Sequence, residues 1–236
     1  LTTNGSVVLN QVIENTADVT TINNFTDVDL SSTVITVIDE VSFENAKLLN
    51  GYTTGEVTVN LVKDTFANIK SIYALNPADV GADGVDLTAA TITVTDAINL
   101  VQATELNDFA YGTVTLNNVA DTYENILYIV DNFAFEVSIA EASIRVNDEV
   151  NIAKVDKLRS VTTGNVTVDL ITEDKDDLST IAAYGDVILS TANISVTDNV
   201  SRSEADAINN YNNSSGTVTL SSITDSFTNV SSVQAN

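Results

Sequence analysis

The side chains best suited to chemistry in this sequence are carboxylates, and four of them recur at regular spacing. Asp39, Asp96, Asp148 and Asp198 each end a short run of alternating apolar and polar residues, with spacings of 57, 52 and 50 residues. Calcium takes oxygen ligands, so this series is a candidate set of calcium ligands. An Asx turn between a strand and a helix explains the same residues without a metal. Both interpretations stay open at this point.

A second group of carboxylates lies close to the single proline. Asp79, Asp83 and Asp86 fall within eight residues that also contain two glycines. This segment resembles a calcium loop in composition, but it lacks the terminal bidentate glutamate and the spacing of an EF-hand. Paired carboxylates can also hydrolyse glycosides. The acids here recur with a repeat and no unique pair stands out, so we predict that the chain is not an enzyme.

The composition excludes several functional classes. The 236 residues include 33 Asp and Glu against nine Lys and Arg, a formal net charge of −24, and they include no Cys, His, Met or Trp. Without Cys or His, thiolate nucleophiles, Ser-His dyads and ordinary zinc, copper or haem sites are excluded. The charge argues against nucleic acid as a partner, because phosphate binding needs clustered basic residues. Two interpretations explain the acidity. The carboxylates could bind calcium, or they could form a salt-adapted surface on which dissolved ions screen the repulsion between them.

Internal repetition is the dominant pattern of the sequence and determines the expected fold. The segment that begins at Ile35 recurs from Ile92, Ile144 and Ile194, and five glycines follow the same rhythm: Gly5, Gly55, Gly112, Gly164 and Gly216. We therefore predict one repeat array over residues 1–236. It comprises a partial repeat (1–34), three complete repeats (35–91, 92–143 and 144–193) and a second partial repeat (194–236).

The first half of each repeat predicts a strand followed by a short helix. Residues 35–39 alternate apolar and polar side chains, which is typical of a half-buried strand. Helix N-caps are predicted at Ser42, Asn99, Asn151 and Ser201. Gln102 and Glu204 supply the third-position acceptor of a capping box. We expect helices of two to three turns, each ended by the repeat glycine.

The second half predicts another strand, another capped helix and a third apolar pair. The strands contain Val57, Val114, Val166 and Val218; the caps are Thr65, Thr122, Asp174 and Ser226; the third pairs begin at Val28, Val85, Val137 and Val187. Strands separated by helices favour parallel pairing. The predicted fold is therefore an α/β repeat solenoid of short parallel strands and short helices, with about 50–57 residues per repeat. Each repeat could form one large coil or two smaller ones.

An aromatic column is predicted at Tyr52, Phe109 and Tyr211, where the third repeat has Val161. Equivalent positions of neighbouring repeats stack in a solenoid, so we interpret the column as packing. A carbohydrate-binding strip is the functional alternative.

The repeats resemble a known group of proteins. Val196-Thr197-Asp198, Glu204-Ala205 and the stretch from Thr163 to Val168 are similar to the tandem repeats of giant bacterial cell-surface proteins. The resemblance is closest to marine cyanobacterial proteins, and related repeats occur in their phages. It covers nearly the whole chain and implies an exported surface or fibre module that is often calcium-dependent. The copies here are degenerate: Thr53-Thr54-Gly55 becomes Ala110-Tyr111-Gly112 in the next repeat.

These patterns together predict a structural or interaction module of an extracellular surface layer, adhesin or fibre. The alternatives are a solenoid that binds glycans or another partner, and a segment of a phage virion fibre. We expect identical chains or neighbouring repeats of a larger parent protein to cover the end strands, at Val7 and Leu9 and at Val218 and Leu220. No apolar run approaches the length of a membrane span. Calcium is the one candidate cofactor.

Overall fold

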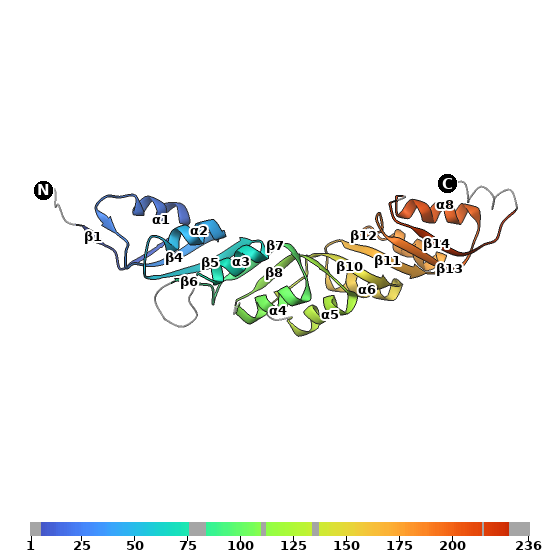
Figure 1. The fold of residues 1–236 in the computed structure, drawn as a ribbon, viewed down its shortest axis with the longest axis horizontal. Helices are drawn as coiled ribbons and strands as arrows, with labels where there is room; N and C mark the ends of the chain where they lie inside the picture. The colour runs from blue at the N-terminus through green and yellow to red at the C-terminus, as the bar shows by residue number, and fades with distance from the viewer. Residues whose placement is uncertain (1–5, 76–83, 110–111, 134–136, 214, 227–236) are drawn as a thin grey trace. The chain divides into compact units, whose positions relative to one another are not determined.

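The computed structural model describes residues 6–75, 84–109, 112–133, 137–213 and 215–226 and shows a repeated α/β fold (Figure 1). The chain forms two compact units. The first contains Leu1–Asn117 and Phe133–Ser138, and the second contains Asn118–Asn132 and Ile139–Asn236. The boundary between them falls within one strand, β8 (Val114–Asp121).

In the first unit, strands and helices alternate along the chain. Its strands are β1 (Val7–Val8), β2 (Gln11–Glu14), β3 (Val28–Asp29), β4 (Val34–Val41), β5 (Glu56–Asp64), β6 (Gly84–Asp86), β7 (Thr91–Ile98), the first half of β8, and β9 (Val137–Ser138). Its helices are α1 (Thr16–Asn23), α2 (Phe43–Asn50), α3 (Phe66–Tyr73) and α4 (Leu100–Phe109).

The second unit continues the same alternation. Its strands are the second half of β8, then β10 (Ser143–Val150), β11 (Val166–Glu173), β12 (Val187–Ile188), β13 (Asn193–Val200) and β14 (Val218–Ile223). Its helices are α5 (Tyr123–Asn132), α6 (Ile152–Val161), α7 (Lys175–Ala182) and α8 (Arg202–Tyr211).

The predicted parallel solenoid is confirmed, and each repeat makes two coils rather than one. In the first unit the hydrogen-bonded order is β2-β4-β5-β7-β8, and in the second unit it is β8-β10-β11-β13-β14. Long strands that follow one another along the chain are therefore neighbours in the sheet, and the strand pairs with a described register are parallel. Parallel neighbours need a crossover connection. One helix supplies each crossover, so one strand and one helix make one coil.

The third apolar pair of each repeat forms a short strand that offsets the coils. In the second unit, β12 pairs with the start of β11 at Val166, while β13 pairs with the end of β11 at Leu170 and beyond. In the first unit, β6 and β7 divide β5 in the same way. The first strand of each repeat is consequently shifted along the strand that precedes it.

The core lies between the sheet and the helices, and equivalent residues of every repeat fill it. Fully buried side chains come from strands at Ile35, Val57, Ile92, Val114, Ile144, Val166 and Ile194, and from helices at Leu49, Ile69, Leu106, Ile126, Leu158, Leu178 and Ile208. Alternation along the strands and three- or four-residue spacing along the helices direct these side chains to the same layer.

The predicted helix starts are confirmed wherever the structure describes them. Ser42, Thr65, Asn151, Asp174 and Ser201 are N-caps whose side chains accept from the backbone N–H three residues later. Capping boxes form at Ser201–Glu204 and at Asn99–Gln102, with hydrogen bonds in both directions. The helix predicted after Ser226 lies outside the described residues.

The prediction that the repeat glycine ends the helix is wrong. Helix α2 ends at Asn50, five residues before Gly55, and helix α6 ends at Val161, three residues before Gly164. The glycine is needed for a different reason. A Cβ on Gly55 would lie 2.5 Å from the carbonyl oxygen of Thr33, and Gly112, Gly164 and Gly216 approach the equivalent carbonyls still more closely.

The threonine two residues before the glycine fixes this close approach. The buried Thr53 hydroxyl donates to the Thr33 carbonyl at 2.7 Å and accepts from the Gly55 N–H at 2.8 Å. Thr162 makes the same pair of bonds with Ala142 and Gly164. The Thr-Thr-Gly sequence is thus a clamp between adjacent coils.

Candidate functional site

The four repeated aspartates occupy equivalent positions, but inside their strands rather than after them. Asp39, Asp96, Asp148 and Asp198 are each the sixth residue of an eight-residue strand. The register with the next strand shifts at this point in β4, β10 and β13, which marks a β-bulge. The expected strand end at the aspartate is therefore wrong by two residues. The bulge adds one residue and re-aims the carboxylate.

Each of these carboxylates accepts a hydrogen bond from the start of the preceding helix. The acceptor is Oδ1 and the donor is the first N–H of the helix: Thr16 to Asp39 at 2.8 Å, Phe66 to Asp96 at 2.7 Å, Tyr123 to Asp148 at 2.7 Å, and Lys175 to Asp198 at 3.0 Å. Helix and strand belong to successive coils, so the bond joins one coil to the next. It differs from the Asx turn considered above, because donor and acceptor lie 23 to 30 residues apart.

Helices α2, α6 and α8 receive the same contact from a second series of acids. Phe43 donates to Asp64 at 2.9 Å, Ile152 donates to Glu173 at 2.5 Å, and Arg202 donates to Asp225 at 3.1 Å. The sequence carried a signal for this series, because an acid immediately precedes the second cap in every repeat. Sequence reasoning missed it, since it treated only the first series as significant.

Two side chains therefore satisfy the start of a typical helix. The N-cap residue accepts from the third N–H, while the carboxylate of the next coil accepts from the first N–H. Unpaired N–H groups and the helix dipole make this end favourable for an anion. Partial burial works against ionisation of Asp64, but hydrogen bonds from the Phe43 N–H, the Asn68 amide and the Thr65 N–H lower the pKa of its carboxyl group.

The predicted calcium ligands do not meet in one place. No member of the Asp39 series belongs to a group of three close carboxylates within the described part of the chain. Asp86 accepts from the Thr88 N–H at 2.8 Å, which forms a local Asx turn. Asp79 and Asp83 lie outside the described residues. Calcium binding by these seven aspartates stays a prediction.

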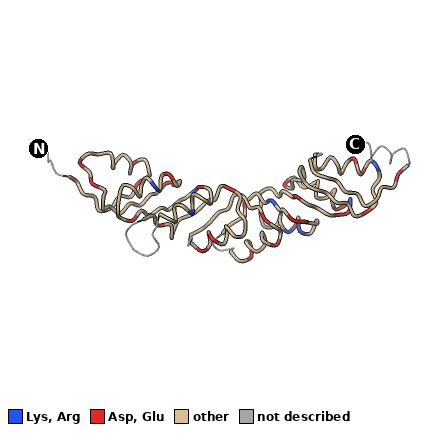
Figure 2. The backbone as a smooth tube through the Cα atoms, viewed as in Figure 1, with Lys and Arg blue, Asp and Glu red and all other residues tan. Residues whose placement is uncertain are grey.

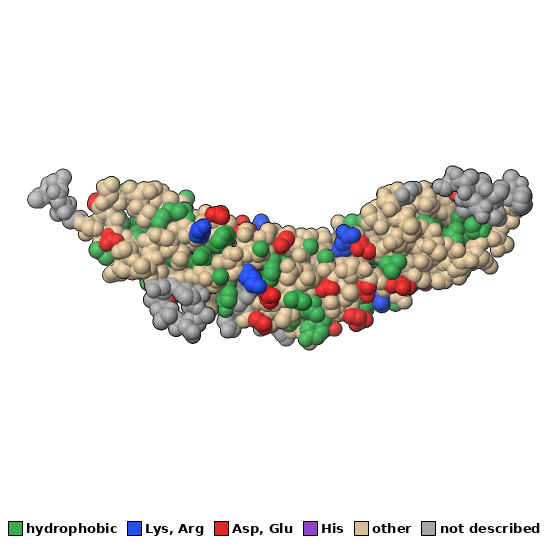
Figure 3. Space-filling view, viewed as in Figure 1, with side chains coloured by type: hydrophobic (Ala, Val, Ile, Leu, Met, Phe, Trp, Pro, Cys, Tyr) green, Lys and Arg blue, Asp and Glu red, His purple; other side chains and the backbone are tan. Residues whose placement is uncertain are grey.

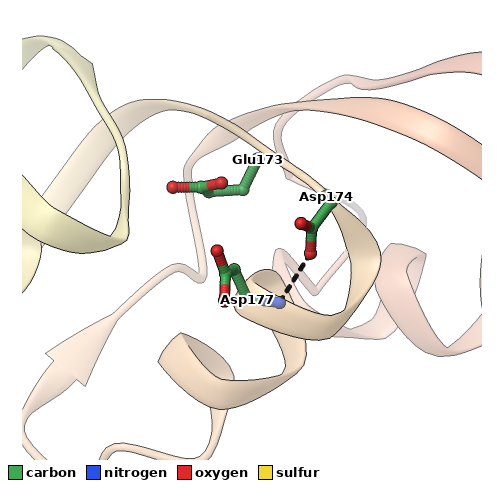
Figure 4. Close-up of side chains that lie close together, drawn as sticks. All are labelled: Glu173, Asp174 and Asp177. Carbon is green, nitrogen blue, oxygen red and sulfur yellow. Dashed lines mark hydrogen bonds between the residues drawn. The ribbon is translucent and has the colours of Figure 1, made fainter.

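One group of three carboxylates does come together, and the sequence analysis did not single it out. Glu173 at the end of β11, the cap Asp174, and Asp177 on α7 each offer an oxygen within 4.8 Å of the others (Figure 4). The three side chains face one another beside the first turn of α7, where Asp174 also accepts the Asp177 N–H at 2.9 Å. This acidic cluster could hold a metal ion.

The equivalent positions of the other two complete repeats contain Asp, Thr and Asn instead of three acids. In those repeats the Asn68 amide donates to Asp64 at 2.8 Å, and the Asn125 amide donates to Asp121 at 2.9 Å. Asp177 takes the place of this amide in the third repeat. A donor is thereby replaced by a second negative charge, which a cation would balance.

The aromatic column has a mixed role in the structure. Tyr52 and Tyr211 are half-buried, as is Val161, and the Phe109 side chain lies outside the described part. Tyr211 borders a groove of about 260 Å³ between α7 and α8, and Tyr52 borders a pocket of about 350 Å³ on α2. The two tyrosines thus both pack against the fold and line open surface.

Carboxylates are spread over both units, whereas Lys and Arg are few (Figure 2). Most basic side chains are paired with an acid: Lys63 with Glu40, Lys70 with Glu105, Arg145 with Asp169, Arg159 with Asp186, Lys175 with Glu204 and Arg202 with Asp206. Arg159 also stacks on the Tyr184 ring at 3.8 Å. These pairs leave a large excess of negative surface.

Glu204 provides a test of the pH dependence of this arrangement. Hydrogen bonds from the Ser201 N–H, the Lys175 ammonium and the Ser201 hydroxyl lower the pKa of Glu204 from 4.5 to about 2. A lowered folded-state pKa stabilises the fold above the unfolded value, and this contribution is lost as pH falls from 4.5 toward 2. We expect Glu204→Gln to be less stable than wild type at pH 7. In urea denaturation the difference should shrink toward pH 2, and a gap that stays constant over this range would contradict the assignment.

No helix among the described residues is long and apolar enough to cross a membrane. Comparisons with protein-family models, with curated proteins and with solved structures found no match.

Proposed function

We propose that this chain is a non-catalytic structural and interaction module of an extracellular surface layer, adhesin or fibre, built by stacking of its repeats. The observation that carries the proposal is the recurrence of one contact, the carboxylate of one coil bound to the first helical N–H of the preceding coil. Because each coil binds the next through the same contact, further coils can be added to the array without a new kind of interface. The resemblance to cell-surface and phage repeats supports both the role and the location.

The terminal strands support assembly with further coils of the same kind. In β14, Val218 and Leu220 are only half-buried, whereas their equivalents Val166 and Val168 are fully buried. Val7 in β1 is 49% exposed, although the equivalent Val57 is fully buried. Within the described part, β14 pairs with β13 on one edge only. Neighbouring repeats or identical chains would bury these side chains.

We expect the isolated chain to associate as its concentration rises, because exposed strand edges accept additional strands. Sedimentation velocity over a hundred-fold concentration range should show oligomers. The double variant Val218→Lys and Leu220→Lys should shift the distribution toward monomer, since it places charges on side chains that a further coil would bury. The matched control is Thr219→Lys, which adds a charge at an exposed position of the same strand. A chain that stays monomeric at every concentration would contradict assembly through its ends.

We further propose that the acidic cluster of Glu173, Asp174 and Asp177 binds calcium. Calcium accepts several carboxylate oxygens in flexible geometry, whereas magnesium demands near-ideal octahedral coordination and loses its water reluctantly. The replacement of a repeat asparagine by Asp177 supports this proposal, because it removes the amide that donates to the carboxylate in the other two complete repeats and adds a negative charge.

Calcium should therefore raise the melting temperature of the wild-type chain more than magnesium or sodium chloride at matched ionic strength. A ligand at about 100 times its Kd stabilises the folded state by about 2.7 kcal/mol. Asp177→Asn should abolish the calcium-specific part of the rise in melting temperature and leave the response to sodium chloride unchanged. Asp176→Asn removes the same charge from an exposed neighbour and should keep the calcium response. Equal effects of the three salts on wild type would rule out the site.

A further inference from the structure

An exposed apolar patch lies on the sheet of the first unit, on the side away from its helices. It consists of Ile13 on β2, Val34 and Ile38 on β4, and Leu61 on β5, with exposed fractions of 55%, 38%, 52% and 41%. The buried residues Val12, Ile35 and Val37 alternate with these positions, so the patch faces away from the core. Figure 3 shows hydrophobic side chains exposed among polar and acidic ones on one face of the molecule.

The patch residues come together through the strand register. Gln11 pairs with Val34 and Ile13 pairs with Thr36, which places Ile13 beside the stretch between Val34 and Ile38. On the other edge of β4, Leu61 pairs with Glu40, one step beyond the bulge that contains Ile38. The three strands are consecutive neighbours, so the four side chains surround Thr36 and Glu40 on one surface.

The other repeats show that the fold does not require apolar side chains here. The equivalents of Val34 are Thr91, Ser143 and Asn193. The equivalents of Ile38 are Thr95, Asn147 and Thr197. The equivalents of Ile13 are Lys63, Ala120, Thr172 and Thr224. Only Leu61 has an apolar equivalent of similar size, Leu170. Because the remaining coils form the same sheet with mainly polar residues at these positions, packing within the coil does not explain the patch.

The charge around the patch selects the kind of partner. Residues 11–64 contain nine Asp or Glu and two Lys. Glu40 lies directly opposite Leu61, and Lys63 approaches Glu40 only to 3.9 Å with both side chains well exposed. An apolar surface with an acidic rim matches apolar side chains flanked by Lys or Arg. A second copy of the same patch would instead bring carboxylates against carboxylates.

We propose that the apolar patch of Ile13, Val34, Ile38 and Leu61 docks a basic amphipathic segment of another protein. This partner surface is separate from the strand edges at which the coils assemble, so the proposal goes beyond the assembly role and does not depend on it. The apolar side chains of the segment cover the patch, and its basic side chains lie against Glu40.

The test uses a fluorescent helical peptide of Leu and Lys as the probe and an equivalent peptide of Leu and Glu as its counterpart. Fluorescence polarisation measures the binding of each to the full chain at physiological salt. The triple variant Ile13→Thr, Val34→Ser and Ile38→Asn takes each replacement from an equivalent position of another repeat and leaves the net charge unchanged. Val101→Ser is the control, because Val101 is a 66% exposed residue on α4 and Ser203 occupies its equivalent position.

We expect the Lys peptide to bind wild type and Val101→Ser equally, and the triple variant at least ten-fold more weakly at an unchanged melting temperature. The Glu peptide should not bind. Equal binding of the Lys peptide to wild type and triple variant would overturn the proposal, because charge alone would then explain the attraction. Equal binding of both peptides to wild type would overturn the proposal that the partner segment is basic. Dimers of wild type that the triple variant abolishes would show that a second copy occupies the patch.

Discussion

Replacing Gly164 with alanine should lower the free energy of unfolding by about 3 kcal/mol, the upper part of the usual range for forced overpacking. The added Cβ would strike the Ala142 carbonyl, with the carbonyl carbon at 2.6 Å and the Glu141 oxygen at 2.8 Å. These are backbone atoms held by the Thr162 clamp, so they cannot move aside as a flexible side chain would. Urea denaturation followed by circular dichroism measures the loss.

Gly185→Ala is the matched control for this variant. No atom lies within 4 Å of the position that its Cβ would occupy. Alanine at a compatible backbone position stabilises slightly by restricting the unfolded chain, so the change should stay below about 1 kcal/mol. If the two variants lose the same stability, the coils do not approach each other at the repeat glycine as closely as described.

Removing the Asp148 carboxylate should cost about 1–2 kcal/mol, as loss of a helix cap usually does. In Asp148→Ala the Tyr123 N–H at the start of α5 loses its acceptor, and the negative charge at the helix N-terminus disappears. Asp148→Asn keeps an oxygen acceptor without the charge, so we expect a smaller loss. Thermal and urea unfolding of wild type, Asp148→Asn and Asp148→Ala measure the order of their stabilities.

The exposed Glu149 supplies the control for Asp148. It follows Asp148 directly in β10, and its replacement by alanine removes the same charge from the same strand. We expect Glu149→Ala to change the stability by less than about 0.5 kcal/mol, as is usual for surface substitutions. A loss equal to that of Asp148→Ala would show that general charge, and not the cap on α5, determines the effect.

Local patterns in the sequence were sufficient to predict the coils. Alternation at Ile35 and Val37, the caps at Ser42 and Thr65, and the capping box at Ser201 depend on residues close together in the chain, and the structure confirms them. Repetition then supplied the parallel stacking, because equivalent segments that alternate with helices have few other ways to pair.

The contacts between coils could not be predicted in the same way. The roles of Asp39 and Gly55 depend on atoms more than 20 residues away, the Thr16 N–H and the Thr33 carbonyl. Local rules offered an Asx turn for the aspartate and a helix end for the glycine, and neither rule includes a neighbouring coil. The acidic cluster was missed for a similar reason: Asp177 is ordinary as a helical residue and is unusual only beside Glu173 and Asp174.

The repeated carboxylates hold successive coils together through the first N–H of each helix. The most direct measurement compares the thermal unfolding of wild type and Asp148→Asn, each in chelator and in excess calcium at matched ionic strength. We predict that the variant melts below wild type by the same amount in both conditions, because the start of α5 loses the negative charge of Asp148 with or without a metal. If the variant matches wild type in chelator and falls below it only in calcium, Asp148 acts as a calcium ligand and the account of the caps is wrong.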